Sequence, residues 1–103
     1  MPPKRERLIK KDFSLLSHKK IIRGSLFDLG YLKSEKIKVG CVISKKTLKR
    51  AVDRNKLKRK IYNSFSLCKP VKPYIYLFYP KREALYTSNL ELKNKISEIF
   101  AKL

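Results

Sequence analysis

Residues 44–65, with the sequence SKKTLKRAVDRNKLKRKIYNSF, combine a dense cluster of positive charge with a helical pattern of apolar residues. Between Lys45 and Lys60, nine of sixteen residues are Lys or Arg, and only Asp53 is acidic. Such a cluster repels itself unless an anion lies beside it. We therefore expect one face of this segment to be held by a core and another to meet a negatively charged partner.

From Ala51 onward, the spacing predicts a helix with separate apolar and basic faces. Five apolar or small residues recur at the 3.6-residue period and should face a core: Leu57, Ile61, Ser64, Phe65 and Cys68. A second row lies about a third of a turn away and carries cations, an amide and an aromatic ring: Arg54, Asn55, Lys58, Arg59 and Tyr62. The remaining side should be solvated, and it consists of Asp53, Lys56, Lys60 and Asn63.

The basic row has two possible explanations. Lysines can serve solubility alone, but acids are then usually interspersed among them, and here they are not. The other explanation is a phosphate backbone lying beside the helix, which the accompanying amide and aromatic ring favour.

The composition of the whole chain points to the same kind of partner. A formal net charge of +19 in 103 residues, 43% of them hydrophobic, predicts a single domain with a modest core and a polyanionic partner, most simply nucleic acid. An anionic membrane would require a basic amphipathic helix or a lipidation motif, and we find neither. There is no secretory signal, and the longest apolar run, residues 74–79, is too short to span a bilayer. We therefore expect a cytoplasmic protein with no membrane partner.

The rest of the chain predicts an α+β fold, a two-layer sandwich with the order αβββαβα. After a loose tail (residues 1–7), we expect a short helix over residues 11–17 and strands over residues 19–23, 26–32 and 37–44. Alternation places Phe27, Leu29 and Tyr31 on one face of the second strand. The third strand contains VGCVIS, which is apolar on both faces and typical of a strand near the middle of a sheet.

A fourth strand is predicted at YIYLFY, residues 74–79, after a proline-containing break. Because a helix separates it from the third strand, those two strands should run parallel. Ser88 and Glu91 form a capping box for a last helix. The apolar stripe of that helix consists of Leu92, Ile96, Ile99, Phe100 and Leu103.

Nothing in the sequence indicates a catalytic or metal site in the protein itself. The eight acids show no spacing suited to a metal or to acid–base catalysis, and His18 has no nucleophile beside it. Cys41 and Cys68 lack CxxC spacing, so buried thiols are a better explanation than zinc. Any chemistry should therefore come from a partner.

Several segments together resemble the bacterial ribonuclease P protein component. The central ones are KVGCVISKK and AVDRNKLKRKIYNSF, and the leading RLIKKDF, the strand PYIYLFYPK and a last helix ending in IF agree with them. The resemblance covers nearly the whole length. It implies a mixed four-stranded sheet with a left-handed β-α-β crossover, as in a domain of a small-subunit ribosomal protein. This hand opposes the usual rule.

The resemblance also implies a function. Members bind a large catalytic RNA, ribonuclease P RNA, and the complex removes the 5′ leader of precursor tRNA by Mg²⁺-dependent hydrolysis. The RNA and its metal ions would perform the cleavage, with Mg²⁺ bound mainly by the RNA. We accordingly expect no metal site in the protein alone and no obligate protein partner.

The family motifs carry these roles to particular residues. The expected RNA-binding residues are Lys45, Lys46, Lys49, Arg50, Arg54, Asn55, Lys58, Arg59 and Tyr62. The cleft for the single-stranded leader, between the first helix and the sheet, would include Phe13, Phe27 and Tyr31, although Phe13 also fits the core stripe of its helix. The chain departs from the family pattern at Ser17, Lys20, Tyr62 and Leu48-Lys49-Arg50, which affects the leader cleft more than the RNA-docking face.

Two other functions are compatible with the sequence. The same fold could bind structured RNA in a ribosome or during its assembly, with no processing role. The basic helix could instead enter the major groove of DNA, but no dimerisation element or helix-turn-helix spacing is visible.

Overall fold

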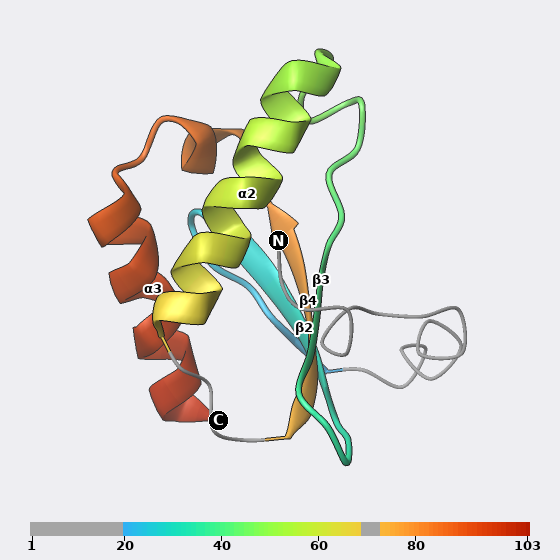
Figure 1. Cartoon of the computed structure of the whole chain (residues 1–103), viewed down its shortest axis with the longest axis vertical. Helices are drawn as coiled ribbons and strands as arrows, with labels where there is room; N and C mark the ends of the chain where they lie inside the picture. The colour runs from blue at the N-terminus through green and yellow to red at the C-terminus, as the bar shows by residue number, and fades with distance from the viewer. Residues whose placement is uncertain (1–19, 69–72) are drawn as a thin grey trace.

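The computed structural model describes residues 20–68 and 73–103, and this part of the chain forms a four-stranded sheet with helices on one of its faces (Figure 1). The strands are β1 (Lys20–Ile22), β2 (Phe27–Lys33), β3 (Lys38–Cys41) and β4 (Tyr74–Pro80). The helices are α2 (Ala51–Leu67), the short 3-10 helix η3 (Arg82–Leu85) and α3 (Asn89–Lys102). The predicted α+β two-layer fold is confirmed. The predicted tail of residues 1–7, the helix over residues 11–17 and Phe13 lie outside the described residues.

The sheet has the order β1-β2-β4-β3 and is mixed. β2 pairs antiparallel with both β1 and β4, whereas β3 and β4 run parallel, as the intervening helix predicted. β4 is central because its aromatic and β-branched residues are covered on both faces, and Ile75, Tyr76, Leu77 and Phe78 are all buried. The hand of the β3-α2-β4 crossover stays a prediction.

The prediction for β3 was wrong in two respects. This strand lies at an end of the described sheet, because β4 inserts between it and β2. It is also shorter than predicted, ending at Cys41 with one further backbone hydrogen bond from Val42 to Phe78 (2.9 Å). Val39 and Gly40 are buried, whereas Val42, beyond the end of the strand, is 43% exposed, so the burial predicted for the whole apolar run holds for only part of it.

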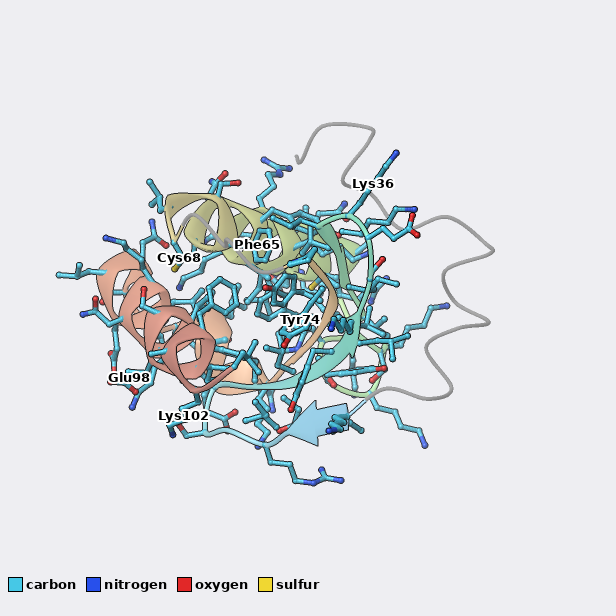
Figure 2. The ribbon with its side chains drawn as sticks, turned by 90° about the horizontal axis from the view of Figure 1, so that it is seen from below. Lys36, Phe65, Cys68, Tyr74, Glu98 and Lys102 are labelled. Carbon is cyan, nitrogen blue, oxygen red and sulfur yellow. The ribbon has the colours of Figure 1, made fainter. Side chains whose placement is uncertain are left out.

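The main core lies between the sheet and the two long helices. The stripe predicted for α2 is confirmed, since Leu57, Ile61, Ser64 and Phe65 are buried and Cys68 packs at its end. The Phe65 ring contacts three others edge to face, those of Tyr76, Phe78 and Phe100, with ring centroids 5.3 to 5.9 Å apart. Figure 2 shows Phe65 and Tyr74 in the interior between helices and sheet. These contacts fix α2 on the sheet.

The opposite face of the sheet carries a smaller apolar cluster. Ile75 and Leu77 are buried there, with Leu32 and Tyr79 packed against them. The alternation of β4 explains the division, because Tyr76 and Phe78 point toward the helices and their neighbours point away.

The turn between β1 and β2 is held by Gly24 and Asp28. A Cβ at Gly24 would lie 2.7 Å from the carbonyl oxygen of Phe27, so only glycine fits without a backbone shift. The Asp28 carboxylate accepts from the Gly24 amide (3.2 Å) and pairs with Arg23 and Lys81, each at 3.5 Å. Lys81 also donates to the Gly24 carbonyl. The predicted turn at Gly24 is thereby tied to the end of β4.

The connection from β4 to α3 contains η3, which was not predicted from the sequence. Its residue Ala84 is buried. The predicted N-cap of α3 is confirmed, because the Ser88 hydroxyl accepts a hydrogen bond from the Glu91 amide (3.1 Å). Lys60 was predicted to be solvated, but its ammonium donates to the carbonyls of Leu85 (3.2 Å) and Thr87. Lys60 therefore holds this connection against α2.

Candidate nucleic-acid-binding surface

The nine cations between Lys45 and Lys60 lie on one continuous stretch, the loop of residues 44–50 followed by α2. In Figure 1 this loop rises from the end of β3 to the N-terminal end of α2. The ion pairs of the described residues join Arg23 and Lys81 to Asp28, and Lys95 to Glu98. None of the nine cations pairs with an acid in residues 20–68 or 73–103. Their charge is therefore not neutralised by the described part of the fold.

The basic loop, residues 44–50, is an ordered turn anchored at several points. The Ser44 carbonyl accepts from the amides of Thr47 (3.1 Å) and Leu48 (3.2 Å), and the two hydroxyls of Ser44 and Thr47 are 3.1 Å apart. Leu48 is only 5% exposed and belongs to the main core. This anchor leaves the loop's four cations exposed: Lys45, Lys46, Lys49 and Arg50.

The basic row predicted for α2 is accessible only in part. Asn55 and Arg59 are exposed, whereas Arg54, Lys58 and Tyr62 are half-buried. Burial raises the pKa of the Cys41 thiol to about 12, and the positive charge of Lys58 acts on it in the opposite direction. Lys58 therefore lies near β3, on the side of α2 that faces the edge of the sheet. The structure brings this row and the basic loop to neighbouring positions.

Among the residues that the structure describes, two of the nine cations make side-chain hydrogen bonds to the backbone. Lys60 holds the carbonyls of Leu85, at the end of η3, and Thr87, and its pKa is lowered, first by burial and then by the charge of Lys56. Arg54 is half-buried, and its Nη1 donates to the carbonyls of Leu48 and Lys49, each at 2.8 Å. Arg54 was predicted as an RNA-binding residue, and the structure adds this internal contact, which helical spacing could not predict.

The predicted leader site needs correction at Phe27. This side chain is 1% exposed and packs edge to face on Phe78 at 5.3 Å, so neither face of its ring can stack on a base. Phe27 is a core residue. Tyr31 shares its sheet face, on the side covered by the helices, and is half-buried with its ring 5.8 Å from that of Tyr74. Tyr31 can offer at most part of its ring.

Tyr79, an aromatic residue on the other sheet face, was not identified from the sequence. Tyr79 is half-buried beside the Ile75 and Leu77 cluster. The signal was present, because alternation along β4 places Tyr79 two residues beyond Leu77 and on the same side. The prediction for residues 74–79 considered them only as a uniform aromatic and apolar strand.

The described residues offer no place for a metal ion. No three His, Cys, Asp or Glu side chains of the described ranges gather closely enough to bind one. Cys41 and Cys68 are free thiols, and the Cys68 sulfur lies 3.3 Å from the Ser97 hydroxyl of α3. Within the same ranges, no helix is long and apolar enough to cross a membrane.

Comparisons with known proteins agree with this geometry. The family model for ribonuclease P matches residues 1–103. The fold is similar to that of the RNase P protein from Thermotoga maritima, with a TM-score of 0.82 and 23% identity over 96% of this chain and 98% of that one. For the RNase P protein of Staphylococcus aureus the TM-score is 0.76, with 20% identity over 93% of each chain. No curated protein sequence matches the chain.

The family match spans all 103 residues, and the sheet with its parallel β3–β4 pair agrees with structures of two bacterial RNase P proteins. The chain belongs to the ribonuclease P protein family.

Proposed function

We propose that this chain is the protein subunit of a bacterial ribonuclease P, which binds the catalytic RNA and assists Mg²⁺-dependent removal of the 5′ leader from precursor tRNA. Membership of the family implies a role in tRNA processing. The observation that carries the proposal is the run of cations between Lys45 and Lys60, which has no acidic partner among the described residues. A polyanion would relieve the repulsion within this run.

The proposed RNA-binding residues differ in the kind of contact that they can make with RNA. Lys45, Lys46, Lys49 and Arg50 are exposed point charges on an ordered loop, suited to phosphates and insensitive to base sequence. On α2, Arg59 can bind a phosphate through two N–H groups, and the Asn55 amide can bridge backbone groups. Lys58 and Tyr62 would contact RNA only through their exposed parts.

The proposed division of labour is supported by the small number of possible metal ligands in the described residues. Asp53 is the one acid within the basic segment, and the described residues do not fit a Mg²⁺ site, which would need several oxygen ligands. In the proposed complex the RNA holds the metal ions and cleaves the phosphodiester bond, while this chain positions phosphates.

For the leader, the proposal is reduced to Tyr31 and Phe13. Tyr31 keeps an accessible part of its ring next to Tyr74, and stacking on an unpaired base would be tolerant of sequence. Phe27 is withdrawn because it is buried.

The test is leader removal by the catalytic RNA from precursor tRNA at low Mg²⁺, with and without the purified chain. We expect the chain to stimulate cleavage and Arg59→Ala to reduce this stimulation. Arg82→Ala is the matched control, since it removes one exposed cation from η3, outside the basic segment. No stimulation at any Mg²⁺ concentration would discard the processing role. Binding of ribosomal RNA in its place would support the structural alternative.

A further inference from the structure

Arg54 makes an unusual contact for a cation in an RNA-binding face. Its Nη1 donates to two consecutive backbone carbonyls, those of Leu48 and Lys49, at 2.8 Å each. One guanidinium nitrogen carries two N–H groups, so both bonds can form together. The two carbonyls belong to the residues just before the N-cap of α2, Arg50. Arg54 thus fastens the end of the basic loop to the first turn of the helix.

Without this contact, the backbone of the basic loop would have little to fix it where it enters α2. Four of its seven residues are exposed cations, and it contains no proline to limit the backbone. The N-cap residue Arg50 makes no side-chain capping bond, so the usual device for fixing the entry to a helix is missing. Like charges so close together favour a spread conformation. Leu48 anchors the loop in the core, and Arg54 holds the carbonyl of that same residue.

We propose that Arg54 is a positioning residue: by holding the carbonyls of Leu48 and Lys49, it keeps the basic loop in the shape that presents Lys45, Lys46 and Lys49 to the RNA backbone. The inference rests on the proposed function for the RNA, but the fastening itself is a property of the free protein. Ordering the loop in advance lowers the conformational cost of binding.

The alternative is that Arg54 contacts a phosphate directly, and the two roles differ in which other residues they depend on. Arg54→Lys does not separate them, because an ammonium carries three N–H groups and can hold two carbonyls, as Lys60 does with those of Leu85 and Thr87. Arg54→Met removes every donor and keeps an unbranched side chain, so it should release the loop as Arg54→Ala does. If Arg54 positions the loop, its effect on RNA affinity should depend on the loop lysines, whereas a direct phosphate contact should act independently of them.

Trypsin provides a test that needs no RNA, because it cleaves after Lys and Arg. Loss of the fastening should increase the cleavage rate after Lys45, Lys46 and Lys49 roughly tenfold in Arg54→Ala and Arg54→Met, since local opening exposes the loop. Arg59→Ala is the control, as it removes a cation from the same helix and leaves the fastening intact. Thermal melts establish that each variant is folded at the temperature of digestion, and if Arg54→Ala is not, Arg54→Met is the variant that is scored. Loop protection equal to that of the unaltered protein in both Arg54 variants would overturn the inference.

A double-mutant cycle on RNA affinity tests the link to binding. Arg54→Ala should weaken binding several-fold in the unaltered protein and have little effect once Lys45, Lys46 and Lys49 are all alanine, because its influence passes through these residues. Arg59→Ala should have the same effect in both backgrounds. An Arg54→Ala effect that is equal in both backgrounds would mean direct contact and refute positioning. If the unaltered protein bound no RNA, the proposed function would fail, and the trypsin result would still decide whether Arg54 holds the loop.

Discussion

Helices α2 and α3 pack on the same face of the sheet, but only α3 has charged residues that complement both of its ends. α3 has a serine N-cap, Glu91 in its first turn, Lys102 in its last turn and a Lys95–Glu98 pair. Its charges therefore complement the helix dipole. α2 has no side-chain cap, no basic residue in its last turn and one acid against five cations. Both helices bury an apolar stripe, so α2 differs from α3 in its charges and not in its packing.

This difference separates folding from binding. The N-cap, the charged ends and the ion pair of α3 are all provided within the helix, so α3 needs no partner to balance its charges. The cations of α2 add little to the fold, apart from Arg54 and Lys60, which hold backbone carbonyls. The missing counter-charge of α2 is what an RNA backbone would supply.

The largest expected effect concerns the buried apolar stripe, which both helices have. Leu57→Ala in α2 and Leu92→Ala in α3 each remove a fully buried side chain, and each should lower the free energy of unfolding by about 2 to 5 kcal/mol. Urea unfolding measures both. A cost below about 1 kcal/mol for Leu57→Ala would show that the stripe of α2 is not a core face.

The next effect concerns an exposed cation of α2, the property in which the two helices differ. Arg59→Ala should weaken RNA binding and reduce the slope of log affinity against log salt by about one, because one phosphate contact is lost. Its free energy of unfolding should change by less than about 0.5 kcal/mol, since Arg59 is exposed. Lys95→Ala in α3 is the matched control and should leave RNA binding nearly unchanged. Equal losses of affinity in the two variants would remove the distinction between the helices.

A smaller effect is expected from the helix caps. Ser88→Ala should destabilise the protein by about 1 kcal/mol, because the Glu91 amide loses its acceptor. Arg50→Ser should do the reverse at α2, since Arg50 already has the extended backbone of an N-cap and serine would supply the missing acceptor. The same substitution should weaken RNA binding by removing a cation. Thermal melts and binding titrations on one preparation would detect this trade-off, and tighter binding by Arg50→Ser would contradict it.

A pH-dependent effect concerns Cys41, the last residue of β3. Burial raises its pKa from 9.0 to about 12, so the folded chain keeps the thiol proton at pH values where the unfolded chain loses it. The stability that Cys41 contributes is therefore full below about pH 9 and is lost as the pH rises toward 12. Between about pH 9 and 10.5, the free energy of unfolding should fall more in the unaltered protein than in Cys41→Ala. Parallel declines would show that the half-buried Cys41 thiol loses its proton as readily in the folded chain as in the unfolded one.

Helical elements could be predicted well because their signals are local. The start of α2 at Ala51, its stripe through Phe65 and the Ser88 cap all depend on residues within a few turns of one another. The exposure of Asn55 and Arg59 follows from the same periodicity. Helical spacing alone could not show that Lys60 would reach the carbonyls of Leu85 and Thr87, because these residues lie 25 and 27 positions away in sequence.

The strands were harder to place because an apolar run does not identify its neighbours. VGCVIS predicted a central strand, yet β4 took the centre and left β3 at the end of the described sheet. Phe27 was assigned to the leader site by the family resemblance, and alternation put it on the strand face of Tyr31, but that sheet face is covered by the helices. Alternation shows which residues share a face, and only the packed structure shows which face is covered.

The sequence by itself determined where the cations lie, which side of α2 is apolar and how α3 begins, because periodicity, charge and capping are properties of short segments. The tertiary structure alone decided which strand is central, that Phe27 is removed from solvent, and that Arg54 and Lys60 hold backbone carbonyls. These outcomes depend on residues brought together by packing across the sheet and between helices, where contact geometry outweighs local preference.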